Sequence, residues 1–169
     1  MLELSALPHY CRGTQLICQL SGDACPTLSN HYRKTYVHLH HYCWALNSEN
    51  KSATMPDREY GQSLLRYAIG DIDYVLERAE PGFKLLPEIY STKARILFKL
   101  QKDADARSAL QQAIKANPKY VPAYSRLSDS LADAGDKDSA MEVLKKGIQQ
   151  AGPKKPLTDR LKLLTTTTE

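Results

Sequence analysis

Apolar residues recur every three or four positions through most of the chain, and this spacing predicts amphipathic helices rather than strands. The clearest helix begins near Pro122, since proline suits the first turn of a helix. Tyr124, Leu127 and Leu131 share its buried face. Glycine tolerates the left-handed conformation that closes a helix, so we expect Gly135 to end this one.

A second helix is predicted from Asp138 to Ala151, after Asp136 as a capping residue. Gly152 and Pro153 stop it, because proline cannot continue a helix. Its inward face comprises Ala140, Val143, Leu144, Gly147 and Ile148.

The same pattern occurs 34 residues earlier, which indicates an internal repeat. Large residues that coincide are Tyr90 with Tyr124, Leu97 with Leu131, Leu110 with Leu144, and Ile114 with Ile148. Small residues that coincide are Ala94 with Ser128, Ala106 with Ala140, and Ala113 with Gly147. Small side chains let two antiparallel helices approach closely, so these positions are the predicted crossing points of helix hairpins.

Residues 121–154, and nearly as well 87–120, resemble the tetratricopeptide repeat in length and in this order of residues. Lys93 and Gln101 depart from the pattern, where the family has Leu and Gly. The resemblance implies an all-α fold, a short right-handed superhelix of stacked helix hairpins.

A third, degenerate hairpin is expected over residues 30–86 from amphipathicity alone. Its helices would be Asn30–Asn47 and Asp57–Glu80, separated by a long polar loop at 48–56. Residues 155–164 would form a capping helix that seals the last repeat with Leu157, Leu161 and Leu164. The tail at 165–169 is expected to be disordered, and residues 1–29 form a Cys-rich extension.

The 169 residues suit one compact domain or a short solenoid, and no stretch is long and apolar enough for a membrane span. The net charge of +4 is spread, with four basic and three acidic residues in positions 1–56 and acids interleaved thereafter. This distribution argues against a nucleic-acid surface.

All four Cys and all five His lie within residues 1–43. An even number of Cys in one short segment favours disulfides and therefore an extracytoplasmic protein. If Leu7–Leu20 is helical, Cys11 and Cys18 lie about 10 Å apart along the axis, too far to pair. Two connectivities remain, and we favour Cys11 with Cys43 and Cys18 with Cys25. The first bond would close a long loop, worth about 3 to 4 kcal/mol.

A metal or haem site in the same segment is the alternative. Only His38 and His41, among the adjacent His38, His40 and His41, share a helix face. The cysteine spacing lacks the tight pairs of a zinc site, and no Cys-x-x-Cys-His motif for covalent haem occurs. Four free thiols would favour the metal hypothesis and a cytoplasmic protein.

No motif indicates catalysis. The sequence contains no Gly-x-Ser-x-Gly, no phosphate-binding glycine loop and no His beyond residue 41. Asp71 and Asp73, two residues apart on a helix, diverge rather than converge. We therefore expect a protein that is not an enzyme and requires no cofactor.

The resemblance implies instead that the first helices of the repeats line a groove for a protein or peptide. Carried over by position, its residues are Glu88, Ser91, Arg95, Phe98, Lys99, Ser125, Arg126, Asp129, Ala132 and Asp133. Phe98 is the one large apolar residue in this set. Some members hold a C-terminal carboxylate with Lys, Asn and Arg, but only Arg126 matches, and Pro122 stands where Lys is expected.

The expected function is therefore that of an interaction scaffold, an adaptor in the assembly of an envelope or secreted complex. Its location would be the periplasm or another extracytoplasmic space, and homo-oligomers are possible for such a scaffold.

Overall fold

A computed structural model describes residues 6–12, 14 and 33–166, and all regular structure in these residues is helical. The all-α prediction is confirmed. The chain divides into two compact units, residues 1–84 and 85–169. No helix in the described ranges combines the length and the apolar character needed to cross a membrane.

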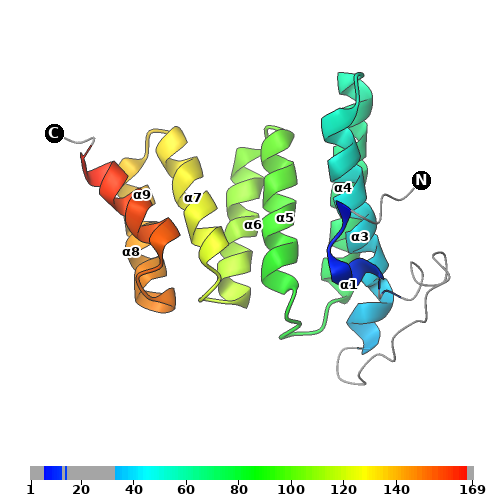
Figure 1. The fold of residues 1–169 in the computed structure, drawn as a ribbon, viewed down its shortest axis with the longest axis horizontal. Helices are drawn as coiled ribbons and strands as arrows, with labels where there is room; N and C mark the ends of the chain where they lie inside the picture. The colour runs from blue at the N-terminus through cyan, green and yellow to red at the C-terminus, as the bar shows by residue number, and fades with distance from the viewer. Residues whose placement is uncertain (1–5, 13, 15–32, 167–169) are drawn as a thin grey trace. The chain divides into compact units, whose positions relative to one another are not determined.

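The described residues of the second unit, 85–166, form five helices (Figure 1). They are α5 (Leu86–Lys99), α6 (Asp103–Ala116), α7 (Val121–Asp133), α8 (Lys137–Ala151) and α9 (Lys155–Thr166). Helices α5 and α6 form one antiparallel hairpin and α7 and α8 the next, with α6 packed on α7. The two hairpins occupy the two segments predicted from the 34-residue repeat.

The small residues predicted at the helix crossings are all buried, namely Ala94, Ala106, Ala113, Ser128, Ala140 and Gly147. Among the described glycines, Gly147 of α8 has the closest neighbours. A Cβ atom added there would lie 2.9 Å from Cγ of Tyr124 and 3.1 Å from Cδ1 of Leu157. Only glycine therefore fits where α7, α8 and α9 meet.

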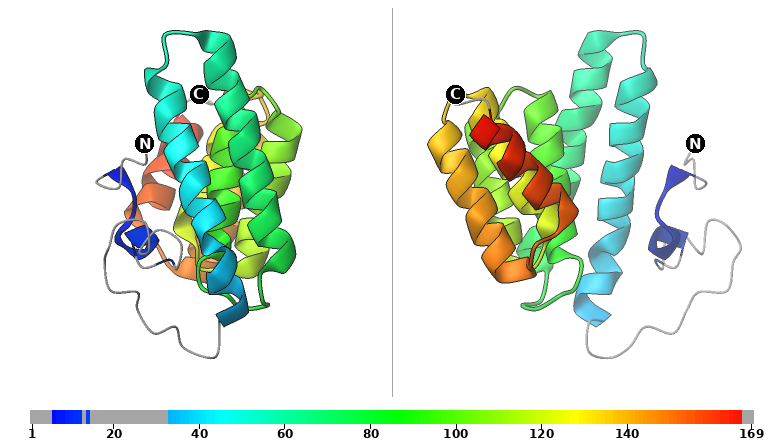
Figure 2. Two further views of the ribbon diagram at one scale, coloured as in Figure 1. Left: turned by 90° about the vertical axis from the view of Figure 1, so that its right-hand side faces the viewer. Right: turned by 60° about the vertical axis from the view of Figure 1, so that its left-hand side comes forward.

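Helix α9 closes the end of the second unit, against α8 and α7 (Figure 2). Leu157 is fully buried and packs with Tyr124 and Leu144, while Leu161 and Leu164 are partly buried against the same cluster. The predicted capping helix is thus present. The predicted disorder at Thr165 and Thr166 is wrong, because both belong to α9 and their hydroxyls donate to carbonyls one turn back, such as that of Lys162. Residues 167–169 lie outside the described residues.

The turn between α5 and α6 has the same backbone conformation as the turn between α7 and α8, although it lacks glycine. Gln101 has φ of 59°, the left-handed value that Gly135 adopts with φ of 85° in the second repeat. The closing hydrogen bonds also correspond, since Lys102 N donates to Leu97 O and Asp136 N donates to Leu131 O, each at 2.9 Å. The turn at Gln101 is therefore formed at the cost of a strained backbone.

In the first unit, α3 (Arg33–Thr54) and α4 (Arg58–Arg78) form the expected hairpin, but the predicted loop at 48–56 is largely helical. Polar composition suggested a loop, yet Glu49 is buried in the hairpin. Gly61 of α4 lies so close to the carbonyl oxygen of Ser52 that an added Cβ would stand 3.2 Å from it. The extra turns of α3 are thus held by contact with the start of α4.

A short helix, α1 (His9–Arg12), lies against α3. The structure pairs Cys11 with Cys43, with Cα atoms 5.7 Å apart and both side chains fully buried. Tyr10 stacks on Tyr42 beside them, with ring centroids 6.4 Å apart. The pairing is the one favoured from sequence. The second predicted pair, Cys18 with Cys25, and half of the predicted helix Leu7–Leu20 lie outside the described residues.

We predict that Gln101→Gly stabilises the protein by about 0.5 to 1 kcal/mol, because glycine removes the left-handed strain. Urea unfolding followed by circular dichroism measures this change. Gly135→Ala is the matched variant and should destabilise by about 1 kcal/mol. A less stable Gln101→Gly variant would contradict the assigned backbone conformation.

We also predict that Gly147→Ala destabilises the protein by about 1 to 2 kcal/mol, because overpacking against Tyr124 exceeds the gain in helix propensity. Gly70→Ala in α4 is the control, since an added Cβ there meets nothing within 4 Å. That variant should be stabilised by about 0.5 to 1 kcal/mol. Equal effects of the two substitutions would show that α8 is not in close contact with α7.

Candidate functional site

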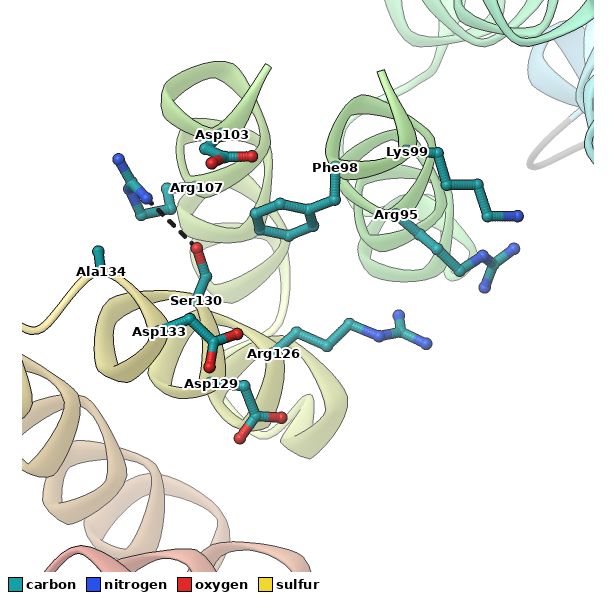
Figure 3. A pocket seen from close by; sticks show the side chains of 10 residues that line it. All are labelled: Arg95, Phe98, Lys99, Asp103, Arg107, Arg126, Asp129, Ser130, Asp133 and Ala134. Carbon is teal, nitrogen blue, oxygen red and sulfur yellow. Dashed lines mark hydrogen bonds between the residues drawn. The ribbon is translucent and has the colours of Figure 1, made fainter. Parts of the chain in front are cut away.

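A pocket of about 540 Å³ lies within the second unit, between α5, the start of α6 and the side of α7 that carries Arg126 and Asp129 (Figure 3). Its lining combines one aromatic ring, four basic and three acidic side chains and two small residues. These are Arg95, Phe98, Lys99, Asp103, Arg107, Arg126, Asp129, Ser130, Asp133 and Ala134.

The pocket contains six of the predicted groove residues, Arg95, Phe98, Lys99, Arg126, Asp129 and Asp133. They come together because they follow helical spacing on the exposed faces of α5 and α7, while Leu97 and Leu127 point into the core. Figure 3 shows Phe98 projecting from α5 into the pocket. Phe98 is half-buried, so part of its ring is available to a ligand.

Four predicted groove residues lie outside the lining. Ser91 and Ser125 are buried, and neither can offer its side chain to a ligand on the surface. The hydroxyl of Ser125 has no hydrogen-bond partner. Glu88 and Ala132 are half-buried. The family register points to the helix faces that border the pocket, but it does not distinguish an exposed position from one covered by the neighbouring helix.

Ser91 nevertheless shapes the site, because it accepts a hydrogen bond from Nη1 of Arg126. This bond joins α7 to α5 and holds the guanidinium of Arg126 beside the first repeat. Tyr120 also hydrogen-bonds to Ser91. Burial, and next the negative charge of Glu88, raise the pKa of the Tyr120 phenol.

Asp129 is bound by a residue that sequence reasoning did not place in the site. Arg160 of α9 donates from Nε to Oδ1 at 2.7 Å and from Nη2 to Oδ2 at 2.9 Å. The Asp129 hydrogen bond raises the pKa of Arg160. A third hydrogen bond, from Nη1 of Arg160 to the carbonyl oxygen of Pro156 at 2.9 Å, fixes the guanidinium to its own helix. One acidic charge of the pocket is thereby neutralised.

Asp103 and Arg107 of α6 were also missed, because the resemblance assigns the groove to the first helices of the repeats. Arg107 donates to the hydroxyl of Ser130 at 3.3 Å and so reaches α7 from the second helix of the first repeat. Asp103 lies in the first turn of α6, where the helix dipole favours a negative charge. No sequence signal distinguishes these residues from an ordinary solvated face.

The histidines considered as metal ligands lie in the first unit. Nδ1 of His41 lies 2.7 Å from Oδ1 of Asp71, and the rings of His38 and His41 both contact Tyr74. Burial, followed by the charge of Arg78, lowers the pKa of His38. In the part of the chain that the structure describes, no three His, Cys, Asp or Glu side chains gather as a metal site would require.

Comparison with protein families matches residues 97–156 to a tetratricopeptide repeat. No curated protein sequence matches the chain. Among solved structures, the first repeat domain of Spaghetti (RPAP3), bound to the HSP90 peptide SRMEEVD, has a TM-score of 0.51 and 21% identity. The alignment covers 74% of this chain and 95% of that chain.

The repeat domain of Sgt2 from Aspergillus fumigatus is similar too, with a TM-score of 0.52 and 21% identity. That alignment covers 73% of this chain and 78% of the Sgt2 domain. At this identity the likeness concerns the fold. Residues 97–156 thus match the tetratricopeptide repeat, in agreement with the 34-residue period, and the fold is that of tetratricopeptide-repeat domains.

Proposed function

We propose that the protein is an adaptor whose second unit binds a short, acidic segment of a partner protein. The observation that carries the proposal is the pocket itself, in which Phe98 stands among four basic side chains and one of three acidic groups is neutralised by Arg160. The peptide bound by the similar domain of Spaghetti is in keeping with this reading.

The pocket suits a peptide better than a small molecule, because it is open along the surfaces of three helices and carries charges along its length. An apolar side chain of the ligand would pack on Phe98, and an acidic side chain or carboxylate would face Arg126 and Arg95. Arg126 is already hydrogen-bonded to Ser91, so less of its side-chain freedom is lost on binding.

The proposal also includes a place of action outside the cytoplasm, in the assembly of an envelope or secreted complex. What supports it is the buried pairing of Cys11 with Cys43 at a Cα separation of 5.7 Å, which suits a disulfide. The family resemblance supports the adaptor role only, and the compartment rests on the cysteines.

The peptide site can be tested with two labelled peptides of equal length, each with a central Leu, flanked by Glu in one and Lys in the other. Fluorescence anisotropy should show micromolar binding of the Glu peptide. Phe98→Ala and Arg126→Ala should each weaken it about fivefold to thirtyfold, the usual range for removing an aromatic or arginine anchor.

Lys145→Ala is the matched control, because Lys145 is exposed on α8 and does not line the pocket. Its Glu-peptide affinity should stay within twofold of the unsubstituted protein. Binding that survives both pocket substitutions at full strength would remove the pocket from the proposed function. Circular dichroism checks that each variant retains its helices.

The compartment is tested by counting free thiols in denaturant, with and without reductant, on protein prepared from an oxidising compartment. We expect thiols at Cys11 and Cys43 to react only after reduction. Cys11→Ser with Cys43→Ser should then destabilise the protein by about 3 to 4 kcal/mol, because 32 residues of sequence separate the pair. Four reactive thiols without reductant would favour a cytoplasmic protein instead.

A further inference from the structure

The bond between Asp129 and Arg160 connects the capping helix to the pocket. Both oxygens of Asp129 are engaged, in the parallel two-bond geometry that arginine forms best with carboxylates. Asp129 lines the pocket, whereas Arg160 is absent from its lining. Arg160 therefore acts on the pocket only through Asp129.

Asp129 has a second arginine within reach along α7. Arg126 precedes it by three residues, a spacing at which oppositely charged side chains on a helix interact. Arg126 is instead hydrogen-bonded to Ser91 of α5. The two arginines thus have separate partners, and Asp129 is the group for which they would compete.

We propose that Arg160 is a positioning residue that sets the charge preference of the pocket, by holding Asp129 and so leaving Arg126 directed at the ligand. This inference rests on the proposed function and adds a specificity determinant to it. Without Arg160, the Asp129 carboxylate repels an acidic ligand and attracts Arg126 away from Ser91. Both effects disfavour acidic peptides and favour basic ones.

The arrangement explains why a capping helix carries an arginine at this point. Leu157, Leu161 and Leu164 of α9 seal the hydrophobic core, and Arg160 lies between them in sequence but projects to α7. Leu157 is fully buried, which fixes α9 against Tyr124 and Leu144. The packing that closes the unit also delivers the guanidinium to the pocket wall.

The test compares Arg160→Gln, Asp129→Asn and the double variant, using the full chain with the Glu and Lys peptides described above at about 20 mM salt, where screening is weak. Arg160→Gln should weaken the Glu peptide about three- to tenfold and strengthen the Lys peptide by a similar factor. The double variant has no carboxylate at position 129 to repel the ligand, so it should bind the Glu peptide within twofold of the unsubstituted protein.

Lys162→Gln is the control for a general loss of positive charge, since Lys162 is exposed on the same helix and does not line the pocket. Its affinities should change by less than twofold. Loss of affinity for both peptides in Arg160→Gln, or a double variant as weak as Arg160→Gln, would overturn the inference while leaving the proposed function intact. Failure of the unsubstituted protein to bind either peptide would remove the proposed function and this inference with it.

Discussion

The close crossing of antiparallel helices, at small residues spaced 34 positions apart, is the constraint on which the second unit depends. Ala94, Ala106 and Ala113 in one hairpin, and Ser128 and Ala140 in the next, are buried where helices meet. At Gly147 there is no room even for a methyl group. Because buried contacts at these positions determine how neighbouring helices pack, they also determine which residues of α5 and α7 face the pocket.

This constraint explains how much of the structure could be predicted from the sequence. The repeat spacing indicated the four helices of the two hairpins, since the buried small and large residues of one hairpin mostly had counterparts 34 positions later in the other. The resemblance to the tetratricopeptide repeat implied a groove that includes Arg95, Phe98 and Arg126, and all three line the pocket. The 34-residue period is lost in residues 30–86, where polar composition suggested a loop at 48–56. Most of that segment is helical, and Glu49 within it is buried. Its burial depends on packing between two helices, which composition does not reveal.

The electrostatics of the pocket could not be predicted in the same way. Charged residues on a helix surface show no sequence pattern that identifies their partners across a chain separation of 31 residues, as between Asp129 and Arg160. The register of the family repeat placed Ser91 among the ligand-binding residues of the groove. In the structure Ser91 is buried, and its hydroxyl accepts a hydrogen bond from Arg126. Partner choice follows from how helices from different parts of the chain are arranged.

The packing of the helices and the arrangement of the pocket's charges are therefore linked in this unit. Moving α9 by even a fraction of a helical turn would expose Leu157 and would separate the guanidinium of Arg160 from Asp129. Moving α7 relative to α5 would break the bond between Arg126 and Ser91. Since the buried contacts resist both displacements, the charged side chains are held before any ligand arrives, and the cost of ordering them is met in folding rather than in binding. A repeat scaffold with few residues on its groove face can thus present a defined charge pattern to its partner.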